Sequence, residues 1–172
     1  MNEFHQADLK GFEVILPVLQ RIPGIIKVEH TESDTDRIDV RLTGVTSDLR
    51  TIVCAIEQKH RNCLSSDYPT VMFNKAKFVY LVNHYIETGE IPVFVSSYSD
   101  AVLFFNLASY PRDKIVYETK PICRKTLYGG EKILQERMML DPRYAYKVQL
   151  HNPIDTFFAP PIATTINTTT TN

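Results

Sequence analysis

The order of apolar and polar residues predicts a chain that opens with a helix and continues into three strands. Residues 4–20 repeat apolar side chains at helical spacing, and Pro17 is expected to end or kink this helix. Apolar runs and alternations at residues 25–30, 36–42 and 51–61 predict strands. The connections between these strands are short, which favours an antiparallel meander.

The third of these strands ends in charged residues, which is unusual for a buried strand. Apart from the small Cys54, residues 52–56 carry no polar side chain, so we expect both faces of the strand to be covered. Glu57, Gln58 and Lys59 follow directly. Because side chains alternate along a strand, Glu57 and Lys59 point the same way and Gln58 points the opposite way. The pattern therefore places a carboxylate beside an ammonium at the end of a rigid element.

The second half of the chain begins with a well-patterned helix and a strand. Residues 70–88 are expected to form an amphipathic helix that ends at Gly89, and residues 91–97 an apolar strand. A strand, a helix and a strand in this order make a right-handed crossover, so the fourth strand is expected to run parallel to the third. The later patterns predict a short helix or extended segment at 100–107 capped by Asp100, a strand at 114–118 and a short helix at 131–140.

Length and composition favour one globular domain followed by a tail. The chain has 172 residues, of which 44% are hydrophobic and 23% are charged, as in ordinary soluble proteins. Residues 151–172 are rich in proline and threonine and show no helical period, so we expect a domain at 1–150 and a tail at 151–172. The tail is expected to be extended, or to pack as an arm across a partner subunit.

The sequence gives no sign of a membrane or of secretion. No apolar run approaches the roughly 18 residues of a membrane span. The first residues lack the basic and apolar regions of a secretory signal. The three cysteines, Cys54, Cys63 and Cys123, are odd in number and form no Cys-x-x-Cys, which favours reduced thiols and a cytoplasmic protein. A zinc site built from Cys63, Cys123 and His60 is the alternative use of these groups.

Charge is distributed unevenly although the formal net charge is only −1. Residues 1–50 hold six Lys or Arg and nine Asp or Glu, a balance of −3. Residues 111–150 hold nine basic and five acidic residues, a balance of +4. An acidic end that binds metal and a basic end that binds phosphate would show this asymmetry, and so would chance variation.

Metal-assisted cleavage of a phosphodiester needs a second carboxylate near Glu57. A carboxylate holds a hard cation such as Mg²⁺, and the neighbouring lysine can orient or deprotonate a water molecule. Asp39 is the candidate, because it interrupts the apolar alternation of the predicted strand at 36–42, where aspartate is disfavoured. Asp34 and Asp36 compete for this role. The bland alternative is a solvent-facing aspartate paired with Arg37 or Arg41, with Glu57 and Lys59 forming a surface ion pair.

This order of elements resembles the PD-(D/E)xK nuclease superfamily. The resemblance is carried by Ile38-Asp39-Val40, by Glu57-Gln58-Lys59, and by the helix that follows them, with Asn74-Lys75-Ala76-Lys77 at its start. It covers about residues 4–118, and the Asp is not preceded by the Pro of the superfamily's name. It implies an α/β (α+β) restriction-endonuclease-like fold, with an αβββαβ core and a mixed central sheet flanked by helices.

The resemblance also implies roles for individual residues. Asp39, Glu57 and the main-chain carbonyl of Gln58 would ligate Mg²⁺ or Mn²⁺. Lys59 would act on the attacking water, and Lys77 would contact phosphate.

Further residues take secondary roles in this scheme. Lys75 is the second choice after Lys77 for the phosphate contact. His60 and Arg61 would bind backbone phosphates, or simply form a solvated strand end. Glu3 or Glu13 on the first helix would add a third acid.

The expected function is that of a divalent-metal-dependent endonuclease that hydrolyses DNA phosphodiester bonds, in phage, repair or restriction-type DNA processing. DNA is the expected partner, RNA stays open, and the resemblance allows a homodimer because two strands need two active sites. The alternative is a DNA-binding or structural and assembly protein of the same fold that does not cleave.

Overall fold

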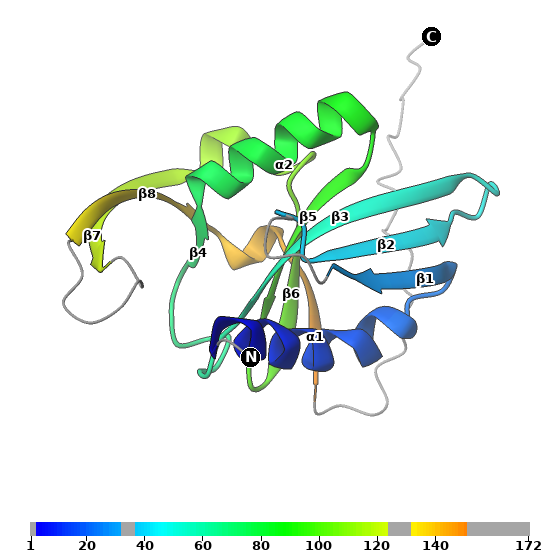
Figure 1. The fold of residues 1–172 in the computed structure, drawn as a ribbon, viewed down its shortest axis with the longest axis horizontal. Coiled ribbons are helices and arrows are strands. Elements are labelled where there is room, and N and C mark those ends of the chain that lie inside the picture. The colour runs from blue at the N-terminus through cyan, green and yellow to red at the C-terminus, as the bar shows by residue number, and fades with distance from the viewer. Residues whose placement is uncertain (1–2, 32–36, 124–131, 151–172) are drawn as a thin grey trace, which may run out of the picture.

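The computed structural model describes residues 3–31, 37–123 and 132–150, and shows a central sheet between two helices (Figure 1). The elements follow the order α1 (Glu3–Gln20), β1 (Ile25–His30), β2 (Val40–Val45), β3 (Thr51–His60), β4 (Val71–Asn74), α2 (Lys75–Thr88), β5 (Ile91–Ser97), β6 (Ala101–Asn106), β7 (Val116–Cys123), β8 (Lys132–Leu140) and β9 (Tyr146–Gln149). Short 3₁₀ turns at Arg112–Lys114 and Pro142–Tyr144 lead into β7 and β9. None of the described helices is long and apolar enough to cross a membrane.

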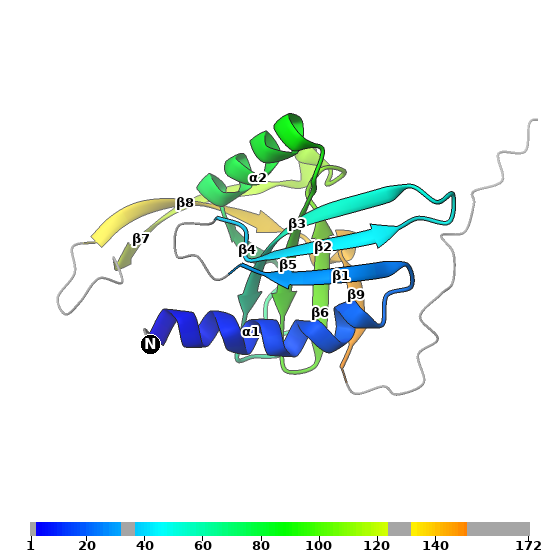
Figure 2. The same cartoon turned by 45° about the vertical axis from the view of Figure 1, so that its right-hand side comes forward.

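The central sheet has six strands in the order β1-β2-β3-β5-β6-β9 within the described chain. β3 and β5 run parallel, as the crossover through α2 predicts, and the other neighbours are antiparallel. Figure 2 shows α1 on one side of this sheet and α2 on the other. The predicted fold class is thereby confirmed: the chain is mixed α+β, and α1, β1, β2, β3, α2 and β5 reproduce the αβββαβ order of a restriction-endonuclease-like core.

A second sheet, in the order β4-β8-β7, joins the central layer beside α2. Its long β7–β8 hairpin reaches away from the central sheet (Figures 1 and 2). The predicted helix at 131–140 is wrong, because β8 pairs with β7 from Lys132 to Met139 and with β4 from Arg137 to Leu140. The stretch from Gln135 to Met139 holds helix-favouring residues, and these pairings override that local preference. The strand predicted at 114–118 begins at Val116 and belongs to this second sheet.

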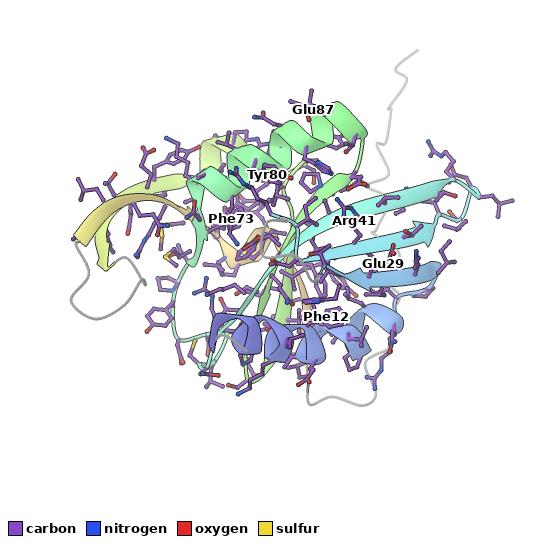
Figure 3. All side chains as sticks on the ribbon, in the orientation of Figure 1. Phe12, Glu29, Arg41, Phe73, Tyr80 and Glu87 are labelled. Carbon is purple, nitrogen blue, oxygen red and sulfur yellow. The ribbon has the colours of Figure 1, made fainter. Side chains whose placement is uncertain are left out.

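Each face of the central sheet has its own apolar core. On the α1 side, Ile15, Val18 and Leu19 pack against strand residues that include Val40, Ile56, Val95 and Val102. On the α2 side, Leu81 packs with a group that includes Ala55, Phe73, Phe94, Leu103, Phe105 and Met138. Figure 3 shows Phe12 and Phe73 on the two sides of the sheet. The helices are therefore fixed against opposite faces by burial of apolar surface.

The second predicted helix starts later than its pattern suggests. Residues 71–74 form β4, which pairs with β8, and the helix begins at Lys75. Asn74 caps it, because its side chain accepts hydrogen bonds from the main-chain N–H groups of Ala76 and Lys77 at 2.8 and 3.3 Å. Gly89 ends it with φ 77°, the left-handed conformation that glycine adopts without strain. The first helix, by contrast, continues through Pro17 to Gln20.

Asp100 does not cap a helix, which corrects the prediction made for it. The segment after it is the strand β6, and the Asp100 carboxylate accepts hydrogen bonds from the N–H and the Oγ of Ser65, each at 2.7 Å. Lys147 on β9 also donates to Ser65 Oγ at 2.8 Å. These bonds connect the loop after β3 with both strands at the far edge of the sheet. The predicted tail at 151–172 lies outside the described residues.

The second strand is displaced relative to its prediction. It covers Val40–Val45 rather than 36–42, and Asp36 lies outside the described residues. Val40 and Leu42 belong to the core on the α1 side, whereas Ile38 is buried in the core on the α2 side. The chain therefore changes face at Asp39 instead of alternating regularly through it.

Candidate functional site

The candidate site lies at the carboxyl end of β3, on the face of the sheet that α2 covers. Ala55, Glu57 and Lys59 alternate onto this face, and the Glu57 residue is only 4% exposed. Lys59, two residues further on, is exposed. Because a buried carboxylate needs positive charge or hydrogen bonds to remain ionised, the surroundings of Glu57 decide what this end of the strand does.

Lys77 supplies positive charge to Glu57. Its Nζ forms an ion pair with Glu57 Oε1, and the lysine side chain remains 46% exposed while that of Glu57 is 6% exposed. The Asn74 cap places Lys77 in the first turn of α2, where the helix dipole opposes a cation. The Glu57 carboxylate offsets this local penalty. The structure thus brings Lys77 to Glu57. The contact of Lys77 with phosphate stays a prediction.

Asp39 stands where the regular pairing of β2 with β3 ends. Its main-chain N–H donates to the carbonyl of Ile56 at 2.9 Å, although Ile56 is the register partner of Val40. Two consecutive residues therefore share one partner, as in a β-bulge. The Oδ2 atom of Asp39 accepts the main-chain N–H of Gln58 at 2.8 Å. This bond fixes the carboxylate beside the residue that follows Glu57.

The arginines considered as partners for Asp39 have other contacts. Arg41 Nε lies 3.3 Å from Glu90 Oε2, and the guanidinium of Arg37 stacks 5.2 Å from the ring of Tyr80. Asp39 itself is half-buried.

Lys75 is directed to the second sheet. Its Nζ contacts both carboxylate oxygens of Glu136 on β8 at 2.9 Å and lies 5.6 Å from the ring of Tyr117 on β7. Lys75 and Lys77 therefore point to different carboxylates although both lie in the first turn of α2. Only Lys77 reaches β3.

His60 and Arg61 are held by hydrogen bonds to the protein. His60 Nδ1 lies 3.0 Å from Ser97 Oγ, and burial lowers the pKa of this histidine below its ordinary value of 6.5, so it is neutral near pH 7. Arg61 donates from Nε to Ser96 Oγ at 2.9 Å and from Nη2 to the carbonyl of Met72 at 2.6 Å. Both residues stabilise the end of β3, and Arg61 links it to β4.

The proposed third acid is not found at this site among residues whose side chains are described. Glu13 is exposed on α1, which packs on the face opposite Glu57: Gly11 of that helix lies against Gln58 and His60. The side chain of Glu3 and all of Asp34 lie outside the described residues.

The cysteines show no zinc site within the described part of the chain. There, no group of three or more His, Cys, Asp or Glu side chains is placed to hold a metal ion. Cys54 is buried, and burial together with Glu90 raises the pKa of its thiol to about 11. Cys63 is a free thiol, and the side chain of Cys123 lies outside the described residues.

The oxygen donors at the end of β3 match the chemistry of a hard divalent cation. Mg²⁺ and Mn²⁺ bind carboxylates and carbonyls and keep several water ligands, so two protein carboxylates can suffice. Asp39, directly before β2, and Glu57 on β3 carry the two candidate carboxylates. The Lys77 ammonium already places a cation against Glu57, which shows that this oxygen takes positive charge in the folded protein. The residues present therefore fit such an ion.

The capping role of Asn74 was not predicted from the sequence. Asn74 decides where α2 begins and hence where Lys77 lies. An asparagine just before a helical pattern is a standard capping signal. It was hidden because the apolar pattern of residues 70–74 belongs to β4 and merges with that of the helix.

Comparison with protein-family models finds no family that matches the chain, and comparison with curated proteins finds no matching sequence. The case for a function therefore depends on the fold and on this group of residues.

Proposed function

We propose that the protein is a divalent-metal-dependent endonuclease that hydrolyses phosphodiester bonds in DNA. The observation that carries the proposal is the ion pair of Lys77 with the buried Glu57 at the end of β3, beside Asp39, within a restriction-endonuclease-like core. Buried carboxylates are kept in proteins when they are paired or when they serve chemistry. Lys59 is exposed and lies two residues beyond Glu57 on the same face of β3.

Each residue has a separate task in this proposal. Asp39 and Glu57, with the Gln58 carbonyl, would hold Mg²⁺ or Mn²⁺, which when bound would polarise the phosphate and lower the pKa of a water molecule. Lys59 Nζ orients the attacking water and takes part in removing its proton. Lys77 Nζ, half-exposed, moves from Glu57 to a phosphate oxygen and balances charge that develops there. Asp39 keeps its orientation through the Gln58 N–H.

The test is cleavage of duplex, single-stranded, nicked and branched DNA in Mg²⁺ or Mn²⁺ by the full chain. Glu57→Gln removes the charge and keeps the shape, and Lys59→Met removes the ammonium. Each is expected to lower the cleavage rate by roughly 100-fold or more. Titration calorimetry with Mn²⁺ gives a second readout, in which Glu57→Gln and Asp39→Asn weaken binding and Lys59→Met does not.

Glu87→Gln is the matched control, because Glu87 is an exposed glutamate on the outer side of α2 (Figure 3). It is expected to cut and to bind metal like the unmodified chain. Equal cutting by Glu57→Gln and the unmodified chain would contradict the proposal. So would a lack of both cutting and Mn²⁺ binding in the unmodified chain, which would favour the non-catalytic DNA-binding or assembly protein.

A further inference from the structure

A cavity of about 530 Å³ opens where β3 ends and faces the β7–β8 hairpin. Its volume lies in the range of roughly 300–1,000 Å³ that is typical of sites for small organic groups. Its lining includes Arg61 after β3, Tyr68 in the following loop, Met72 on β4, and Lys120, Arg137 and Met139 on the hairpin. No residue of the proposed catalytic group lines it.

The charged residues of this cavity favour an anionic ligand. Arg61, Lys120 and Arg137 face a single carboxylate, that of Glu118, whose Oε2 lies 2.8 Å from Lys120 Nζ. His60 also lines the wall. Three cations against one carboxylate leave an excess of positive charge.

Arg137 has a donor that the described part of the chain does not satisfy. Its Nε is buried and has no hydrogen-bond partner there. A buried N–H without an acceptor costs free energy, and the side chain that carries it also lines the cavity.

The other walls of the cavity are apolar and aromatic. Tyr68 is 65% exposed at the rim, a large exposure for an aromatic ring. Met72 and Met139 line the interior, and methionine adapts to flat aromatic groups. A ligand that suits the basic wall and the apolar wall carries an anionic group and a flat ring. A nucleotide has both groups.

The cavity adjoins the proposed catalytic residues along the chain. Lys59, His60 and Arg61 are consecutive, and two residues of strand span about 7 Å. In a duplex each base is stacked and paired, so a base enters a cavity only after it is unstacked and unpaired. That cost is lowest for a base of an unpaired strand. We infer that the cavity holds an unpaired base of the strand bound at Lys59, so that the preferred substrate is single-stranded or branched nucleic acid. This inference rests on the proposed function.

The experiment measures binding without cleavage. The full-length Glu57→Gln protein is titrated in EDTA against a fluorescent single strand, the matching blunt duplex, and single strands in which one abasic position is moved stepwise. The single strand is expected to bind more tightly than the duplex. One abasic position is expected to weaken binding by roughly 5-fold to 100-fold, the contribution of one stacked base. The same strands made as RNA show which sugar is preferred.

Added variants assign this effect to the cavity. Tyr68→Ala should weaken binding of the intact strand by a similar factor and remove the abasic effect. Tyr68→Phe should preserve the affinity for the intact strand and the abasic effect. Arg137→Gln should weaken binding of intact and abasic strands alike. Tyr146→Ala is the control, because Tyr146 is 57% exposed on β9 and does not line the cavity. Thermal melting establishes that each variant is folded.

Two results would overturn the inference: equal affinity for single strand and duplex, or an abasic effect that survives in Tyr68→Ala. Failure of the catalytic proposal is a different result. If the protein shows the abasic effect but cuts no substrate, the base-binding cavity is supported and the nuclease proposal fails. If the protein cuts with metal but Tyr68→Ala leaves binding of the strand unchanged, the cavity inference fails and the nuclease proposal is supported.

Discussion

Glu57 is a buried carboxylate on β3, and its ion-pair partner, Lys77, lies on α2. The apolar run before Glu57 forces the strand into the core, so the charge is buried by its position in the chain rather than by its own preference. Lys77 crosses from α2 to meet it. Neither residue would be placed so by local propensity, since Lys77 opposes the dipole of its own helix.

Lys77→Met is therefore expected to destabilise the fold by about 1–3 kcal/mol, because Glu57 loses a cation while it remains buried. The measurement is urea unfolding followed by circular dichroism near pH 7. The double variant Glu57→Gln/Lys77→Met should recover much of the loss, since it removes both charges.

Lys75→Met provides the comparison for this experiment. Its partner Glu136 is 61% exposed, and surface ion pairs contribute about 1 kcal/mol or less. A loss in Lys75→Met as large as that in Lys77→Met would contradict the argument from burial.

At the scale of elements, the short segment from β4 into α2 determines how the site is assembled. β4 ties Asn74 to the second sheet, and the Asn74 cap then starts the helix at a fixed residue. Lys77 lies in that first turn, so the position of its ammonium depends on a strand pairing as well as on the helix. Any change that frays the first turn is expected to loosen the contact with Glu57.

Asn74→Ala is expected to lower the free energy of unfolding by about 1 kcal/mol, because the N–H groups of Ala76 and Lys77 lose their acceptor. Thermal or urea unfolding measures this loss. Asn83→Ala, at an exposed position inside the same helix, is the control and should be neutral or slightly stabilising. A neutral Asn74→Ala would show that pairing of β4 alone fixes the helix start.

Much of the central layer could be predicted from the sequence, because its signals are strong and local. The apolar strand before Glu57, the long amphipathic helix and the parallel crossover all follow from periodicity and from chain order. The resemblance predicts that Lys77 contacts phosphate, and the structure places Lys77 beside Glu57. The phosphate contact stays a prediction.

Other features depend on contacts distant in sequence. β8 is a strand only because β4 and β7 flank it, and Asp39 lies at a bulge that no local pattern marks. The cavity is formed by residues from 60 to 139, so its composition could not be read before the two sheets were placed side by side. The division into a domain at 1–150 and a tail at 151–172 stays a prediction.

At the scale of the whole molecule, one polar cluster connects parts of the chain that are far apart. Asp100 directly precedes β6, Ser65 lies in the loop after β3, and Lys147 lies on β9. Burial of the Asp100 carboxylate tends to raise its pKa, but the hydrogen bonds from Ser65 and the charge of Lys147 outweigh this and hold the pKa below 3.8. The cluster therefore favours the ionised carboxylate in the folded state.

The sign of the pH dependence follows from this lowered pKa. The stabilisation from Asp100 is fully present above the unfolded pKa of about 3.9 and is lost as the pH falls through the lower folded value. Asp100→Asn should lower stability by about 1 kcal/mol near pH 7 and flatten this acid loss. Urea unfolding from pH 7 down to pH 3 measures both effects.

Asp113→Asn is the control, because Asp113 is exposed and its pKa is lowered chiefly by the adjacent Lys114, with a smaller contribution from its own main-chain N–H. It should leave stability near pH 7 almost unchanged. If Asp100→Asn loses stability between pH 7 and pH 3 as steeply as the unmodified chain, other carboxylates determine the acid sensitivity of the fold.

The late position of β9 has a consequence for synthesis of the protein in the cell. β6 ends at Asn106, but its outer neighbour β9 begins only at Tyr146, after the whole β7–β8 hairpin. Domains form from the N-terminus as the ribosome extends the chain. Until β9 emerges, β6 presents an open edge with its main-chain groups unpaired, and such an edge pairs readily with strands of other chains. A nascent chain stalled within the hairpin would therefore be the form most exposed to aggregation and most in need of a chaperone.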